Sequence, residues 1–317
     1  MIEEDLLAFS KTFPELTKLD TFAHSEFDLP LYRLVISQNG TKGKWPLVLV
    51  GNIHAREDYS SKYVMKFANL FLLSVSGKDS TYPEASKLLE KWYMVIIPVA
   101  NPDGLKIAHE DWTSIESHKD SVLALKRMQT LAEWKANGKG IDLNSNFNDG
   151  NHLYKCSAIN QEAPASEGYK GCFPTEAKEV IALEQLLLNL NPLLTLSFHT
   201  KGNVLFWRDC DTYTQFNEVD SIINYRVARH TGLNLAPISY NPISYGCGLE
   251  NFVRVRLNQL AVCVEFSPMI NGRIQHPDRK FNELVWKNCE QLPIVYMQAM
   301  LDCQVQWTEM MRNAGNP

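Results

Sequence analysis

The segment Leu47-Val48-Leu49-Val50-Gly51-Asn52-Ile53-His54-Ala55-Arg56-Glu57 joins an apolar run to a polar motif of chemical interest. Residues 47–53 are mostly apolar, which predicts a central strand of a sheet with both faces buried. The strand leads into a turn that carries His54 and Glu57, three residues apart. An imidazole and a carboxylate in such a turn can bind one cation, and both are good zinc ligands. Taken alone, the motif also fits a purely structural role.

Two later apolar runs place a second histidine and a second acid near the same edge of the predicted sheet. His199 follows the predicted strand 193–198, and Glu265 lies within the predicted strand 259–266. Because parallel strands place their carboxyl ends along one edge of a sheet, His199 is the best candidate for a third ligand. A catalytic zinc ion has three protein ligands and one open position for water.

Glu265 is surrounded in the sequence by apolar residues, and an ionised carboxylate buried without a partner is strongly disfavoured. One explanation is a structural salt bridge to a buried Arg or Lys. The other is a general base that accepts the proton of a zinc-bound water and passes it to a leaving amine. The residues by themselves leave both explanations open.

Further apolar runs alternate with segments of helical periodicity, which is typical of an α/β protein. The segment 106–173 is polar and irregular, as expected for a functional loop region, and no linker or repeat divides the chain. We therefore expect a single domain, 1–317. The predicted strands are 31–37, 47–53, 93–99, 193–198, 203–207 and 259–266, and the predicted helices are 60–76, 82–91, 175–189, 216–231, 248–256 and 279–311.

The composition excludes several classes of protein. The 317 residues include 31 Lys and Arg against 36 Asp and Glu, a net charge of −5, and no block of like charge is present. Binding to nucleic acid or to an anionic membrane is therefore disfavoured. The N-terminus is acidic and no apolar stretch approaches the roughly 18 residues of a membrane span, so we expect a cytoplasmic protein.

The seven cysteines are widely spaced and contain no CxxC pair. Their odd number and their spacing favour reduced thiols and exclude a structural zinc knuckle. A bridge between Cys156 and Cys172 stays possible, because both lie in one loop-like stretch.

Five ordered motifs resemble those of the zinc carboxypeptidase family, which contains carboxypeptidases A and B. They lie between about Leu47 and Pro268: Gly51-Asn52-Ile53-His54-Ala55-Arg56-Glu57, Pro98-Val99-Ala100-Asn101-Pro102-Asp103-Gly104, Gly140-Ile141-Asp142-Leu143-Asn144, Ser197-Phe198-His199 and Val264-Glu265. The resemblance implies one zinc ion held by His54, Glu57 and His199, with Glu265 as general base. It also implies a mixed, twisted sheet of about eight strands sandwiched by helices.

The same resemblance assigns residues around the substrate. Lys135 follows Trp134 where the family has a basic residue, usually Arg, that polarises the scissile carbonyl. Asn144 falls on the position that binds the terminal carboxylate of the substrate. Ser145 stands where carboxypeptidases A and B carry an Arg that clamps this carboxylate, so ordinary release of C-terminal residues is in doubt.

The substrate tyrosine of the family has no direct counterpart. Counting back from Glu265 without gaps places it on Ile243, so Tyr245 or Tyr240 would have to fill the role. Glu250, at the start of a predicted helix, occupies the family position that lines the pocket for the residue after the scissile bond. An acid there favours a cationic side chain, although an acid at a helix start is also common for purely structural reasons.

Two stretches are similar to a branch of the family that hydrolyses the γ-D-glutamyl to diaminopimelate bond of cell-wall muropeptides. They are 134–144 and 199–207, which match in the order of their Trp, Lys, Asn, His and Gly residues. A muropeptide is therefore the expected substrate. The alternatives are release of C-terminal Lys or Arg as by carboxypeptidase B, an aspartoacylase-type amidohydrolase, and a zinc-binding module that does not cleave, which would require the acid at Glu265 to be absent.

Overall fold

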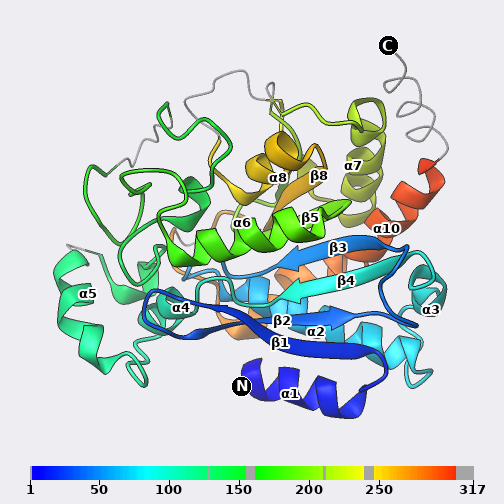
Figure 1. Ribbon diagram of the computed structural model, residues 1–317, viewed down its shortest axis with the longest axis horizontal. Coiled ribbons are helices and arrows are strands. Elements are labelled where there is room, and N and C mark those ends of the chain that lie inside the picture. Colours follow the sequence, from blue (N-terminus) through cyan, green and yellow to red (C-terminus); the bar gives the residue numbers. More distant parts are fainter. Residues whose placement is uncertain are drawn as a thin grey trace.

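A computed structural model describes residues 2–126, 129–154, 161–209, 212–238, 246–270 and 272–304 of the chain. Its core is a mixed eight-stranded sheet with the strand order β1-β2-β4-β3-β5-β8-β6-β7 (Figure 1). The strands are β1 Thr17–His24, β2 Pro30–Ile36, β3 Trp45–Val50, β4 Trp92–Ile97, β5 Leu194–Thr200, β6 Val204–Phe206, β7 Asn234–Leu235 and β8 Leu260–Phe266. The predicted mixed sheet of about eight strands is confirmed.

Four parallel strands form the centre of this sheet. β3 pairs with β4 and with β5, and β5 pairs with β8, all in parallel. The outer strands β1, β2 and β6 run antiparallel to their inner neighbours. β3 shows why the centre is apolar throughout, since Leu47 and Leu49 enter one hydrophobic cluster and Val48 and Val50 enter another. Both faces of the strand are thus buried, as the sequence predicts.

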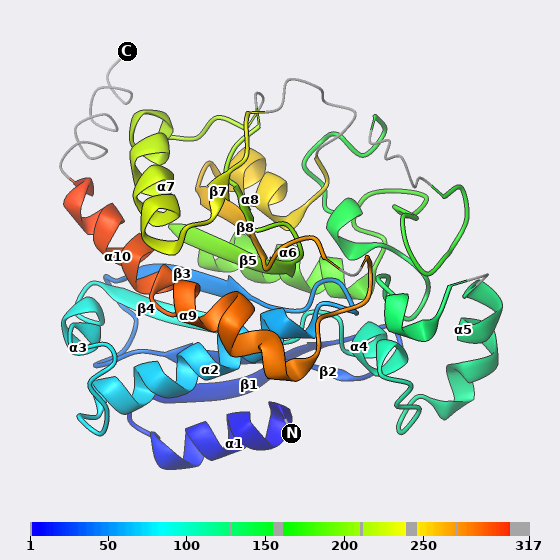
Figure 2. The same cartoon turned by 180° about the vertical axis from the view of Figure 1, so that it is seen from behind.

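Helices cover both faces of the sheet, as the views from opposite sides show (Figures 1 and 2). α2 and α10 pack on one face together with α7, and α6 and α8 pack on the other. The helices of the described residues are α1 Ile2–Thr12, α2 Asp58–Val75, α3 Ala85–Leu88, α4 Pro102–Ala108, α5 Lys119–Leu125, α6 Lys178–Leu190, α7 Asn217–Thr231, α8 Leu249–Leu257, α9 Lys287–Cys289 and α10 Leu292–Asp302.

Some predicted elements differ from the observed ones. The predicted helix 279–311 is interrupted, because Pro293 lies at the start of α10 and a short π-helical turn, Asn282–Trp286, precedes α9. The predicted helix 82–91 shrinks to α3, and the predicted loop region 106–173 contains α5. α1 and β1 were not predicted, since β1 is an edge strand without a fully buried residue.

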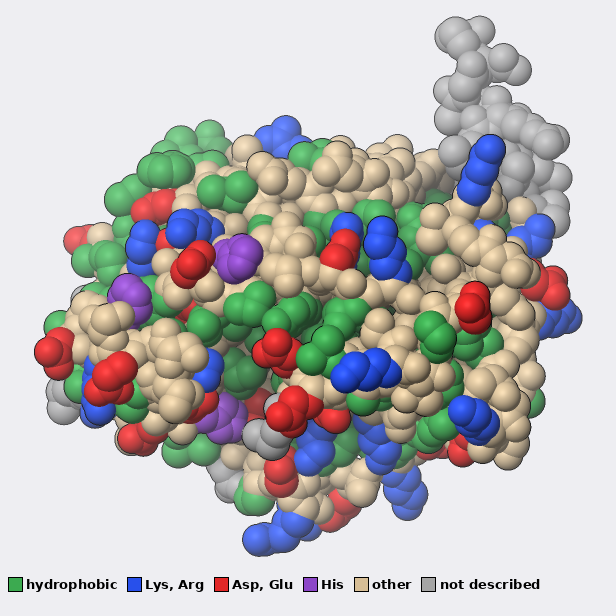
Figure 3. Space-filling model, turned by 60° about the horizontal axis from the view of Figure 1, so that its bottom comes forward, with side chains coloured by type: hydrophobic (Ala, Val, Ile, Leu, Met, Phe, Trp, Pro, Cys, Tyr) green, Lys and Arg blue, Asp and Glu red, His purple; other side chains and the backbone are tan. Residues whose placement is uncertain are grey.

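The described residues show how charged side chains and cysteines are distributed in the structure. Figure 3 shows basic and acidic side chains interspersed on one face, without a large area of one sign. Among the described helices, none has the length and apolarity to cross a membrane. Five cysteines of the described residues are free thiols, namely Cys172, Cys247, Cys263, Cys289 and Cys303. Cys156 lies outside the described residues.

Two acids outside the predicted site are fully buried beside each other. Asp103 accepts hydrogen bonds from the Ser25 hydroxyl and the Phe27 amide, and Glu179 accepts one from the Asn137 side chain. Burial raises the pKa of Asp103 to about 6 and, with the charge of Asp103, the pKa of Glu179 to about 7. Ionisation of this buried pair near neutral pH therefore lowers the stability of the folded protein.

We predict that Glu179→Gln flattens the pH dependence of stability. A carboxyl group whose pKa is raised on folding stabilises the protein below its unfolded pKa of about 4.5. That contribution is lost as the pH rises through about 7, and for Glu179 it amounts to roughly 3 kcal/mol. The wild-type free energy of unfolding in urea should fall between pH 5 and pH 8.5, and the variant should show a smaller fall.

The exposed Glu218 provides the matched control, because Glu218→Gln removes the same charge from a solvated position. Parallel pH profiles for wild type and Glu179→Gln would contradict the assignment of a buried, proton-binding Glu179.

Candidate metal centre and active site

The turn after β3 holds the first two candidate ligands in place. Gly51 is required there, because a Cβ on this residue would lie 2.8 Å from the Pro98 carbonyl oxygen. Asn52 adopts a φ of 52° and its side chain donates to the carbonyls of His54 and Ala55. These bonds fix the turn so that His54 and the side chain of Glu57 face the carboxyl end of the sheet.

The three predicted ligands converge. Glu57 Oε1 lies 2.9 Å from His54 Nδ1, and Glu57 Oε2 lies 3.0 Å from His199 Nδ1. The two Nδ1 atoms are only 3.1 Å apart, and all three residues are buried. Two imidazole nitrogens facing each other beside a carboxylate form a donor set that suits a divalent cation such as zinc. These three residues are one of the groups in the described chain able to hold a metal ion.

The other ring nitrogens of the two histidines face an acid and a hydroxyl group, and only His199 Nε2 makes a hydrogen bond. His54 Nε2 lies 3.3 Å from Asp142 Oδ1, and His199 Nε2 lies 2.8 Å from the Ser197 hydroxyl oxygen. If each Nε2 carries the proton, beside Asp142 for His54 and Ser197 for His199, each Nδ1 keeps a free lone pair for a metal ion. Asp142 and Ser197 thus lie against the two predicted histidine ligands, a position that was not predicted although both residues lie inside the quoted motifs.

The ionisation of the surrounding acids favours this arrangement. Burial alone would raise the pKa of Glu57, but His54 and His199 hold it well below its usual range. In the same way, Lys135 and His54 overcome burial and keep the pKa of Asp142 well below its usual range. Both carboxylates therefore stay charged at neutral pH, as a cation-binding shell requires.

Glu265 lies beside the ligand triad because of strand register. β5 and β8 pair in parallel with His199 opposite Glu265, so both side chains lie at the same level of the sheet. Its Oε2 atom is buried and has no hydrogen-bond partner. Glu265 also forms no ion pair with the described residues, which disfavours the structural salt bridge. Burial, reinforced by the charge of Glu57, raises its pKa to about 7.

Lys135 is close to the triad but is already paired. Its Nζ donates to Asp142 Oδ2 at 2.9 Å, and its backbone carbonyl accepts from the Ala55 amide. Burial lowers the pKa of Lys135, but Asp142 outweighs this effect and raises it, so the side chain stays cationic. A positive charge is therefore held next to the metal site.

Asn144 and Glu250, two of the predicted substrate-binding residues, lie on segments that contact each other. Asn144 Oδ1 accepts from the Leu249 amide at 2.9 Å, which joins this residue to the first turn of α8. Glu250 lies in the same turn, and its Oε2 atom is buried without a hydrogen-bond partner. Ser145 ends the short helical turn that contains Asn144. The candidate tyrosines Tyr245 and Tyr240 lie outside the described residues.

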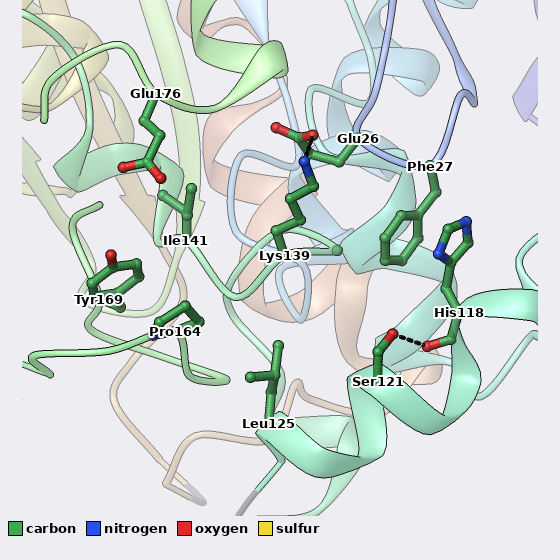
Figure 4. A pocket seen from close by; sticks show the side chains of 11 residues that line it. Glu26, Phe27, His118, Ser121, Leu125, Lys139, Ile141, Pro164, Tyr169 and Glu176 are labelled. Atoms are coloured by element: carbon green, nitrogen blue, oxygen red, sulfur yellow. Dashed lines mark hydrogen bonds and ion pairs between the residues drawn. The ribbon is translucent and has the colours of Figure 1, made fainter. Parts of the chain in front are cut away.

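A separate cavity of about 430 Å³ is lined in part by Ile141, the residue before Asp142 (Figure 4). Ile141 and Tyr169 line it on one side, and the stacked rings of Phe27 and His118, with centroids 3.8 Å apart, line it on the other. None of the predicted ligands or catalytic residues faces this cavity. We therefore place the chemistry at the triad.

Comparisons with known proteins agree with this geometry. A family model for zinc carboxypeptidases matches residues 2–253. The chain is 29% identical over 174 residues to gamma-D-glutamyl-L-diamino acid endopeptidase 1 of Lysinibacillus sphaericus, covering 51% of this chain and 43% of that protein. It is 30% identical over 156 residues to the inactive metallocarboxypeptidase ecm14 of Sclerotinia sclerotiorum, covering 48% of this chain and 23% of that protein. The matches thus span less than half the length of these relatives.

The fold also resembles solved structures. The crystal structure of thrombin-activatable fibrinolysis inhibitor superimposes with a TM-score of 0.71 at 18% identity, covering 94% of this chain and 72% of the other. At this identity the likeness concerns the fold alone.

The geometry predicts that His199→Ala and Glu57→Gln abolish binding of one zinc ion per chain, because each removes one of three ligands. Zinc content after gel filtration, measured by atomic emission, tests this. Zinc should also raise the thermal unfolding temperature of the wild type but not of either variant.

His24→Ala is the control, since His24 is exposed and lies on the edge strand β1. Retention of a full equivalent of zinc by His199→Ala would rule out the proposed ligand set.

Proposed function

The chain belongs to the zinc carboxypeptidase family, and from this premise we propose that it hydrolyses a peptide or isopeptide bond with zinc as its cofactor. The observation that carries the proposal is the convergence of His54, Glu57 and His199, with Glu265 in register beside them. Each of the four groups is on an element whose position is fixed by the sheet.

His54, Glu57 and His199 would hold the zinc ion. When bound, zinc supplies a Lewis acid that activates water and polarises the carbonyl of the scissile bond. Asp142 and Ser197 hold the imidazole rings in the orientation that the ion needs.

Glu265 would act as the general base. It accepts a proton from the attacking water and later donates it to the leaving amine, so the amide bond breaks while a carboxylic acid and a free amine form. Its unpartnered Oε2 and its pKa near 7 suit both halves of this cycle. Lys135 would carry positive charge towards the developing oxyanion, sharing its ammonium with Asp142.

The substrate we propose is a cell-wall muropeptide, cleaved between γ-D-glutamate and diaminopimelate. The name of the Lysinibacillus sphaericus relative supports this class, because that protein is an endopeptidase for gamma-D-glutamyl-L-diamino acid bonds. Ser145 also supports it, since a short hydroxyl cannot clamp a C-terminal carboxylate as a guanidinium does. Asn144 would then contact the leaving residue without a neighbouring cation at position 145.

One observation favours a second candidate, the release of C-terminal Lys or Arg as by carboxypeptidase B. The unpartnered carboxylate oxygen of Glu250 would attract any cationic side chain, and lysine offers the same amine as diaminopimelate. The two candidates differ in the bond cleaved, so L-Ala-γ-D-Glu-diaminopimelate and hippuryl-lysine distinguish them. We expect hydrolysis of the first, and loss of that hydrolysis when a chelator removes the metal.

Glu265→Gln should lower kcat/KM on the cleaved peptide by about 10²- to 10⁴-fold, because the amide cannot accept the proton of the attacking water. Zinc content and thermal unfolding should stay close to wild type, since Gln occupies the same volume. A steady-state assay with the zinc-loaded proteins measures the effect.

Glu116→Gln is the matched control for this substitution, because Glu116 is exposed and lies on the short helical turn Glu116–His118, which carries none of the site residues. Turnover by Glu265→Gln within threefold of wild type would refute the assignment of the base.

A further inference from the structure

Two opposite charges near the first turn of α8 lack ionic partners among the described residues. The Oε2 atom of Glu250 and the Nε atom of Arg208 are both buried without a hydrogen-bond partner. Neither side chain forms an ion pair with any part of the chain that the structure describes. Leaving such groups unpaired is unfavourable, so a ligand that pairs with both would be bound strongly.

The strand end that carries Arg208 is tied to the turn that carries Glu250. Arg208 follows β6, and the next residue, Asp209, accepts a hydrogen bond of 3.1 Å from the side chain of Asn251. Asn251 follows Glu250 directly in α8. Arg208 and Glu250 are therefore the residues that directly precede Asp209 and Asn251, whose side chains join the end of β6 to α8.

This region adjoins the catalytic acid. β6 pairs with β8 so that Phe206 lies opposite Cys263, two residues before Glu265. The Cys263 thiol is buried, and its pKa is raised well above the usual range by that burial and by the charges of Glu250 and Glu265. The first turn of α8 also contacts the loop that carries Asp142, because the Leu249 amide donates to Asn144 Oδ1 at 2.9 Å, and this contact places Glu250 on the side of the reacting centre.

A second arginine of this region, Arg254, is fully buried and already neutralised. Arg254, one turn after Glu250, pairs with Asp220 and donates to the Thr212 carbonyl. Arg208 influences Asp220 only at longer range, since no ion pair joins them. Arg254 is therefore a structural residue, and its charge is not available to a ligand.

Aromatic rings orient the guanidinium of Arg208. Its Cζ atom lies 5.3 Å from the ring centre of Trp207 and 5.0 Å from that of Tyr213. Trp207 is itself anchored by a hydrogen bond from its Nε1 to the Ala236 carbonyl. A guanidinium beside two aromatic rings keeps its N–H groups, with which it can bind a carboxylate through two hydrogen bonds.

We propose that Arg208 and Glu250 together bind a leaving residue whose side chain ends in both a carboxylate and an ammonium group, as that of diaminopimelate does. Glu250 pairs with the ammonium and Arg208 with the carboxylate. Arg208 is thus a specificity-determining residue that separates diaminopimelate from lysine, which offers only the amine. The inference rests on the proposed function, because it assumes that this region receives the leaving residue.

Two matched peptides test the inference, L-Ala-γ-D-Glu-meso-diaminopimelate and L-Ala-γ-D-Glu-L-Lys, which differ only in the distal carboxylate. We expect the wild type to prefer the first in kcat/KM, and Arg208→Met to lower the ratio of the two values at least tenfold. Arg208→Lys should restore part of the ratio. Glu250→Gln should weaken both peptides, since both carry the ammonium. Arg229→Met, at an exposed position of α7, is the control.

Calorimetric binding in the Glu265→Gln background separates this inference from the proposed function. With Arg208 intact, the diaminopimelate peptide should bind at least tenfold more tightly than the lysine peptide, and Arg208→Met should remove the difference. An unchanged affinity ratio in both Arg208 variants, with zinc content preserved, would overturn the inference. If the wild type hydrolyses neither peptide but the affinity ratio behaves as expected, the inference stands and the proposed reaction falls.

Discussion

The parallel pairing of β3, β5 and β8 is the constraint on which the site depends. It places His54, Glu57, His199 and Glu265 at one edge of a sheet whose interior is otherwise apolar. The two imidazole nitrogens that face each other there are both within hydrogen-bond distance of the buried Glu57 carboxylate. A divalent cation bound between the three groups would accept a lone pair from each of them, and metal binding would therefore stabilise this edge of the fold.

A second layer of polar contacts holds this edge in place. Asn101 donates to the carbonyls of Ile53 and Ala136 and accepts from the Gly104 amide at the start of α4. Gly104 must be glycine, because a Cβ there would lie 2.5 Å from the Ala136 carbonyl oxygen. Asn101 thus joins the turn after β3 to the segment that carries Lys135 and Asp142. The motif at 98–104 acts through geometry and contributes no catalytic group of its own.

The sequence predicts most of the sheet and the ligand set because both depend on local patterns. Apolar runs reveal the buried strands, and a polar residue that ends such a run falls at the ligand edge, as His199 does. Elements without a strong local pattern were missed, such as the edge strand β1. Asp142 was missed as a functional residue because its role depends on contacts with His54 and Lys135 that only the tertiary structure creates. Pro293 indicates an interruption in the predicted helix 279–311, but that helix was predicted from hydrophobic periodicity alone.

Two residues, Ser145 and Arg208, change the distribution of positive charge around the site relative to carboxypeptidases A and B. Ser145 removes a cation from the neighbourhood of Asn144, where carboxypeptidases A and B bind a main-chain carboxylate. Arg208 places a cation without an ionic partner among the described residues at the strand end bonded to the first turn of α8. If the leaving residue binds here as proposed, such a site would attract a carboxylate on its side chain more than one on its main chain. Such a shift would turn a fold that releases terminal residues into one that recognises an amino-acid head group, with the same metal chemistry.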